Sequence, residues 1–166
     1  MDLLKDFLFW QPKNCLISKL NKNLIVVLNY IIWPFLGYIS LLLILKDPHV
    51  FWQLLVATIL GEIIEKIGKK HPHINWKRPF IDKKHTVPQG LIYSWYEHGS
   101  FPSGHSIKVV YFLLFIIQYQ VFNPVIYCLI VIPFLLFRVF IGFHYPIDMF
   151  GGATIGLLLW RLTSNL

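Results

Sequence analysis

Acidic residues are scarce in this sequence, because Asp and Glu together number 8 of 166 residues against 15 for Lys and Arg. Charged residues make up 14% of the chain, whereas 56% is hydrophobic and the mean hydropathy is +0.59. Ordinary soluble domains have an apolar share of about one half, so this composition excludes that class. We therefore predict one integral membrane domain. Its cationic surplus favours anionic lipid headgroups or an anionic substrate over nucleic acid.

Cysteine is also scarce, with only Cys15 and Cys128 in the chain. The two share no metal-ligand spacing, and Cys128 lies in an apolar run, where a free thiol behaves as a small hydrophobic side chain. We expect neither a disulfide nor a structural zinc site. A cleaved signal peptide is not expected either, because the start of the chain mixes charges and its apolar run at residues 7–10 is short.

Long apolar stretches dominate the rest of the chain and predict an all-α helical bundle. All are expected to be helices, since the strands of a lipid-facing barrel would alternate in polarity. About 20 residues cross a hydrocarbon core, so the third and fifth stretches are short spans. The predicted transmembrane domain covers residues 24–166, and residues 1–23 are expected to form an interfacial helix or a flexible tail. The five predicted spans are residues 24–45, 49–67, 106–122, 124–142 and 147–162.

The distribution of positive charge predicts the orientation of the bundle. With five spans, every Lys and Arg except Lys46 and Arg161 lies on one face, together with the N-terminal segment. By the positive-inside rule this face is cytoplasmic, which places the protein in the cell (inner) membrane with that face inward.

Three polar clusters lie at the membrane boundary of this same face. They read KKHPHINWKRPF after the second span, FPSGHS before the third, and FRVFIGFHYPID between the fourth and fifth. Residues far apart in sequence meet at one end of a helix bundle, where sites are often built. In the second cluster, Ser103 is a candidate N-cap of a helix whose free amides bind an anion. Gly104 would allow close approach to the backbone, with His105 beside it. A plain helix start is the alternative.

The third cluster carries the most chemical information. Arg138 near the end of an apolar span is costly unless it faces the bundle interior and has a partner, although snorkelling is an alternative. Asp148 follows His144 by four residues, so it can accept a hydrogen bond from one ring nitrogen and leave the other as a nucleophile or base. Together with Lys70 and Arg78, these groups supply the positive charge, the nucleophile and the acid that phosphoryl transfer needs. The alternative role of Lys70 and Arg78 is that of membrane anchors.

Together the clusters resemble the motifs of the type 2 phosphatidic acid phosphatase superfamily, which also includes glucose-6-phosphatase and vanadium haloperoxidases. Its motifs are K-x6-R-P, P-S-G-H and S-R-x5-H-x3-D, in that order. This chain has Arg78-Pro79, an intact P-S-G-H at residues 102–105, and the third motif from Arg138 to Asp148. It departs from the pattern at His71, where a lysine is expected with Lys70 one position earlier, and at Phe137, where a serine is expected.

The resemblance implies a metal-independent lipid phosphate phosphatase with no cofactor. His144 would attack phosphorus with Asp148 orienting it, and His105 would protonate the leaving alkoxide and then activate water. The substrate classes implied are polyprenyl phosphate or diphosphate, phosphatidate and phosphatidylglycerol phosphate. Membrane members of the family commonly have six spans and act on the outer face, against the charge-based prediction. The implied phosphate-binding residues are Lys70, Arg78, Ser103, Gly104 and Arg138.

Two other classes of function remain as alternatives. One is a non-enzymatic membrane scaffold or transporter subunit. The other is a metal-dependent membrane hydrolase, against which the sequence has no H-E-x-x-H pair and no regular ligand spacing. Its candidate ligands would be His71, His73, His85, His98, His144 and Asp148.

Overall fold

The computed structural model describes residues 3–13, 16–71, 73–74, 76–82 and 98–166, and within these ranges every regular element is helical. The all-α prediction is therefore confirmed for the described chain. The elements in order are α1 (Leu3–Leu8), the 3-10 turn η1 (Leu16–Ser18), α2 (Lys22–Tyr30), α3 (Ile32–Lys46), α4 (Val50–Lys70), α5 (Pro79–Asp82), α7 (Gly104–Tyr119), α8 (Pro124–Phe140) and α9 (Pro146–Thr163).

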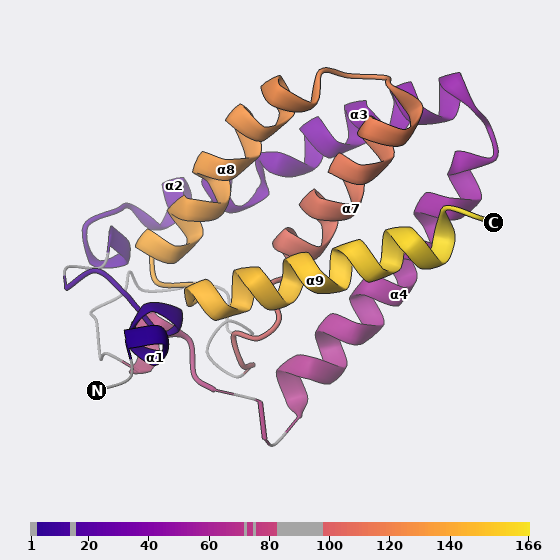
Figure 1. The fold of residues 1–166 in the computed structure, drawn as a ribbon. Coiled ribbons are helices and arrows are strands. Elements are labelled where there is room, and N and C mark those ends of the chain that lie inside the picture. The colour runs from indigo at the N-terminus through magenta and orange to yellow at the C-terminus, as the bar shows by residue number, and fades with distance from the viewer. Residues whose placement is uncertain (1–2, 14–15, 72, 75, 83–97) are drawn as a thin grey trace.

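Helix α7 lies at the centre of the bundle. It packs against α3, α4, α8 and α9 (Figure 1). Its apolar side chains, among them Ile107 and Phe115, are buried in the core that these helices share. The sequence sets the start of α7 locally, because the Ser103 side chain accepts a hydrogen bond from the Ser106 amide, as predicted for an N-cap. Helix α9 begins with Pro146, whose fixed φ suits the first helical turn.

Two glycines allow α9 to approach α7 closely. A Cβ atom on Gly152 would lie 2.5 Å from the Ser103 carbonyl oxygen, and one on Gly156 would lie 2.5 Å from the Ile107 carbonyl oxygen. Small residues four apart are a common device for close helix packing in membranes. The approach lets the Ser103 amide donate a hydrogen bond of 3.1 Å to the Asp148 carbonyl. The P-S-G-H turn and the third motif are thus held together through the backbone.

Replacing Gly152 with alanine is expected to destabilise the protein by about 1–3 kcal/mol, because the new methyl group meets backbone atoms that no side-chain rotation can move away. Thermal unfolding of the purified protein in detergent measures the loss. Gly37→Ala is the matched control, since a Cβ atom there has no heavy atom within 4 Å. Equal stability of the two variants would contradict the close packing of α7 and α9.

The membrane prediction receives partial support from the helices. In the part of the chain that the structure describes, one helical segment, Lys22–Lys46, is long and apolar enough to cross a bilayer, while α7 and α8 are apolar but shorter. Large apolar side chains such as Leu45, Leu129 and Leu158 are exposed on α3, α8 and α9. Exposed apolar surface of this extent marks contact with lipid or protein. The five predicted helical stretches are present, and their passage through a bilayer stays a prediction.

The N-terminal segment packs on the end of the bundle where α8 ends and α9 begins. The ring of Phe7 lies 6.3 Å from that of Phe150, and the ring of Trp10 lies 5.8 Å from that of Phe140. Its predicted position at a membrane interface is not tested by these contacts. Cys15 and residues 83–97, His85 included, lie outside the described residues. Cys128 is a free, partly buried thiol on α8.

Candidate active site

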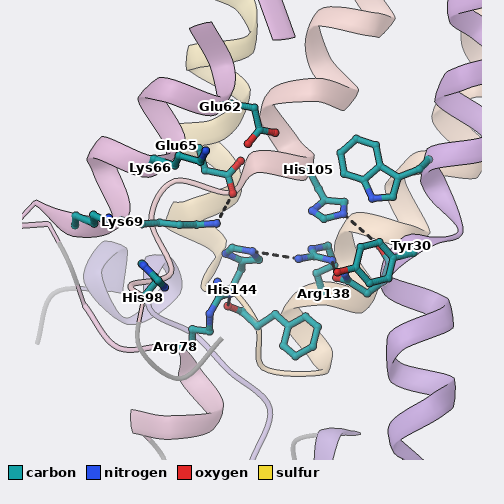
Figure 2. A pocket seen from close by; sticks show the side chains of 14 residues that line it. Tyr30, Glu62, Glu65, Lys66, Lys69, Arg78, His98, His105, Arg138 and His144 are labelled. Carbon is teal, nitrogen blue, oxygen red and sulfur yellow. Dashed lines mark hydrogen bonds and ion pairs between the residues drawn. The ribbon is translucent and has the colours of Figure 1, made fainter. Parts of the chain in front are cut away.

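A cavity of about 360 Å³ lies at the end of the bundle where α4 and α8 end and α7 begins. Each of the three polar clusters contributes to its wall, as Figure 2 shows: Arg78 from the first, His105 from the second, and Arg138 and His144 from the third. The predicted convergence of the clusters at one end of the bundle is therefore present. The chemical roles assigned to these residues stay predictions.

His144 lies in the turn between α8 and α9 and is 2% exposed. The Arg138 carbonyl accepts hydrogen bonds from the amides of Phe143 and His144, at 3.0 and 3.4 Å, which brings the ring back beside the Arg138 side chain. His144 Nε2 lies 3.5 Å from Arg138 Nη2. Because a guanidinium group only donates, Nε2 is the acceptor there, and the ring proton belongs on Nδ1.

The protonation state of His144 suits a nucleophile. Burial lowers the pKa of His144 well below its ordinary value, and the positive charges of Arg138 and Arg78 lower it further. The imidazole is therefore neutral at neutral pH. Its Nδ1 lies 3.4 Å from Asp148 Oδ2, close enough for electrostatic stabilisation, although the geometry does not make a hydrogen bond. The structure therefore places His144 and Asp148 next to each other, as predicted, but without the predicted hydrogen bond.

Asp148 is fully buried and also caps α9. Its Oδ2 accepts a hydrogen bond of 2.7 Å from the Tyr145 amide, and its Oδ1 accepts one of 3.0 Å from Trp76 Nε1. The carboxylate therefore ties the first cluster to the third and is held rigidly behind His144. The helix-start interpretation of Asp148 is correct as well, since one carboxylate both caps the helix and faces the histidine.

Two buried guanidinium groups supply positive charge to the cavity. Arg78 Nη1 donates to the Phe143 carbonyl at 3.0 Å, and Arg138 Nη1 donates to the Asn29 side-chain oxygen. Arg138 thus faces the interior and has a partner, as predicted. Burial lowers the pKa of Arg78 to about 10, which leaves it cationic at neutral pH. The Nε atoms of both arginines are buried and have no hydrogen-bond partner among the described residues, an arrangement that an anion would satisfy.

His105 extends from the first turn of α7 towards α2. Its Nε2 lies 3.3 Å from the Asn29 carbonyl oxygen, so Nε2 carries the proton in this contact. The ring packs between Trp33, at 5.2 Å, and Phe134, at 5.5 Å. His105 and His144 therefore line the same cavity from different elements, with Arg138 bonded to His144 and to Asn29.

The remaining predicted phosphate-binding residues lie in different places. Lys70 lines the cavity and is exposed at its rim. Ser103 is fully buried as the cap of α7, and neither it nor Gly104 is among the residues that line the cavity. The position that a Cβ atom on Gly104 would take is occupied by the carboxylate of Glu65. The open approach to the Gly104 backbone expected from the sequence is therefore covered by a side chain.

Sequence reasoning missed several cavity residues, among them Asn29, Glu65 and Lys69. Lys69 lines the cavity beside Lys70, pairs with Glu65 and extends towards His144 (Figure 2). A signal was available, because charges recur on α4 at three- and four-residue spacings that place them on one face of an otherwise apolar helix. Those charges are Glu62, Glu65, Lys66 and Lys69.

The histidines do not gather into a metal site within the described ranges. No group of three or more His, Cys, Asp or Glu residues there has the geometry to hold a metal ion. His71 lies at a separate shallow depression with Lys66 and Lys70, and His98 lines the main cavity. His85, the remaining candidate ligand of the metal-dependent alternative, falls on the undescribed part of the chain.

Comparison with known protein families gives a match over most of the chain. No curated protein and no solved structure matches the chain. The family model described as the PAP2 superfamily matches residues 50–166, which run from α4 to the C-terminus and include every cavity residue except Asn29, Tyr30 and Trp33. Since this match covers most of the chain, the chain belongs to the PAP2 superfamily.

Proposed function

We propose that this protein is a membrane-embedded lipid phosphate phosphatase that works through a phosphohistidine intermediate without a metal ion. Membership of a superfamily that generally comprises phosphatases supports the phosphatase class. The observation that carries the mechanism is the position of the buried His144 ring, which lies between the Asp148 carboxylate and the Arg138 guanidinium at the wall of a cationic cavity.

In the first step, the lone pair of His144 Nε2 attacks the phosphorus atom and the bond from phosphorus to the ester oxygen breaks. His105, which must enter this step as the imidazolium, transfers a proton to the leaving alkoxide and becomes neutral, and the alkoxide departs as the alcohol. Phosphorylation of Nε2 makes the imidazole ring cationic while Nδ1 keeps its proton. The Asp148 carboxylate at 3.4 Å stabilises that positive charge, in the way a third residue supports other activated nucleophiles.

In the second step, neutral His105 accepts a proton from water, and the resulting hydroxide attacks phosphorus. The bond from phosphorus to Nε2 breaks, inorganic phosphate forms and His144 recovers its lone pair. Both steps develop negative charge on the phosphoryl oxygens. We assign the stabilisation of that charge to Arg78, Arg138, Lys69 and Lys70, which take the role that a magnesium ion has in other phosphoryl transfer sites.

The lipid character of the substrate is inferred from the surroundings of the cavity. Helices α2 and α3, which form the segment apolar enough to cross a bilayer, contribute Asn29, Tyr30 and Trp33 to its wall. A headgroup bound there would have its chain beside apolar helix surface. Polyprenyl phosphate or diphosphate, phosphatidate and phosphatidylglycerol phosphate all fit this description. The positive charge at this end supports a cytoplasmic orientation in the cell membrane.

Phosphate release from a panel of these lipid phosphates by the purified protein in detergent tests the proposal. Activity is expected on at least one of them, with inhibition by orthovanadate, which mimics pentacoordinate phosphorus, and no loss of activity in EDTA. Loss of activity on chelation would favour the metal-dependent hydrolase instead. No phosphate release from any lipid on the panel would leave the non-enzymatic alternative.

A further inference from the structure

A carboxylate lies inside the cationic cavity, where a phosphatase needs positive charge. Glu65 projects from α4 into the cavity wall, and its side chain is only 16% exposed (Figure 2). It pairs with Lys69, the lysine that extends towards His144. Its Oε2 also lies 3.7 Å from Lys108 Nζ. Glu65 is therefore paired with Lys69, a cation that we assign to binding of the phosphoryl group.

The same carboxylate covers the start of α7. It occupies the space beside Gly104 that a Cβ atom would otherwise fill, and Gly104 is the first residue of that helix. A helix N-terminus has a partial positive charge and free amides, which favour any nearby anion. In the structure the anion at this position is the protein's own carboxylate, between Lys69 and Lys108.

We propose that Glu65 occupies part of the phosphate site when the site is empty and competes there with inorganic phosphate, the product. This inference rests on the proposed phosphatase function. A phosphate anion that takes Lys69 must separate it from Glu65 and then bear the repulsion of a carboxylate held nearby by Lys108. The lipid substrate is less affected, because contacts of its chain add to its binding and inorganic phosphate lacks them. Glu65 thereby promotes release of the product.

Glu62 provides a matched control on the same helix. Its Oε1 lies 2.6 Å from Lys108 Nζ, so it belongs to the same charge network and is one turn away from Glu65. Its side chain is 44% exposed, however, and the atoms that a Cβ on Gly104 would meet belong to Glu65. Replacing either glutamate with glutamine removes one negative charge from the cavity wall. Only the Glu65 change removes a charge from the start of α7 and from Lys69.

The experiment measures the dissociation constant of inorganic phosphate for the purified full-length protein in detergent, by isothermal titration calorimetry. Glu65→Gln is expected to bind phosphate about tenfold more tightly than the unaltered protein, because a like charge a few ångströms from the ligand is removed. Glu62→Gln is expected to stay within about threefold. The inhibition constant of phosphate in the lipid phosphatase assay should fall by the same factor for Glu65→Gln.

Tighter binding distinguishes competition from a structural role, since loss of a structural contact would weaken binding. Unchanged or weaker binding by Glu65→Gln, in a protein that still hydrolyses lipid phosphates, would overturn the competition and leave the phosphatase function intact. Absence of both phosphate binding and hydrolysis in the unaltered protein would overturn the phosphatase function and this inference with it. If Glu65→Gln does not fold, Glu65→Asp decides, because its shorter side chain withdraws the charge from Gly104 and should also tighten phosphate binding.

Discussion

Replacing His144 with alanine is expected to abolish phosphate release, with a fall in kcat on the order of 10⁴-fold or more, as for other nucleophiles that form a covalent intermediate. The lone pair of His144 Nε2 faces the Arg138 guanidinium in the cavity, and the Asp148 carboxylate lies behind the ring. The cationic wall remains in the variant, so binding of inorganic phosphate should change far less than kcat.

The phosphohistidine itself provides the measurement. A brief reaction with substrate labelled on phosphorus, stopped in alkali, should leave acid-labile label on the unaltered protein and none on His144→Ala. His49→Ala is the control, because His49 is exposed next to the N-terminus of α4, at the opposite end of that helix from the cavity. A His144→Ala protein that released phosphate at the unaltered rate would end the catalytic assignment.

Replacing His105 with alanine is expected to slow hydrolysis of an alkyl phosphate by about 10²–10⁴-fold, the range typical of general acid and base catalysis. The effect should depend on the leaving group. An alkoxide needs a proton as it departs, whereas p-nitrophenolate is stable without one. Formation of the phosphoenzyme from p-nitrophenyl phosphate should therefore be slowed by less than about tenfold. The second step, which needs His105 as the base, should be slow for every substrate.

A fast first step followed by a slow second step predicts a burst of p-nitrophenol release in rapid-mixing measurements. His105→Ala should release about one p-nitrophenol per protein molecule and then stall, while label accumulates on His144. The unaltered protein should show steady release with little accumulated label. An equal slowing of phosphoenzyme formation for alkyl and p-nitrophenyl leaving groups would argue against His105 as the acid. It would leave the residue with its packing role between Trp33 and Phe134.

Local features of the structure were predictable because they depend on short-range geometry. The start of α7 follows from Ser103 as a cap, and the start of α9 from Pro146 at its first position. The spacing of Arg138 and His144 could be read as one site because a turn of six residues brings them into contact, at 3.5 Å. The convergence of the three clusters followed from counting the predicted spans, because every second connection between consecutive spans lies on the same face of the membrane.

Contacts between distant segments could not be predicted in this way. Asn29 lies in an apolar stretch outside the residues that match the family, yet its side chain binds Arg138 and its carbonyl contacts His105. Lys69 rather than His71 lines the main cavity because α4 continues to Lys70, and the helical rotation of each residue determines which side chain faces inward. When the chain departs from the family motif, the spacing of the motif does not show which side chain of the helix faces the cavity.

The sequence by itself determined the helical architecture, the superfamily and the residues that carry the proposed chemistry, because hydrophobic runs, helix caps and ordered motifs are all encoded locally. Only the tertiary structure decided what surrounds those residues. It showed that Asp148 caps a helix while it faces His144, and that the glycines of α9 hold the P-S-G-H turn against the third motif. It also placed Glu65 over Gly104, because the distance between a side chain on α4 and the start of α7 depends on how the two helices pack.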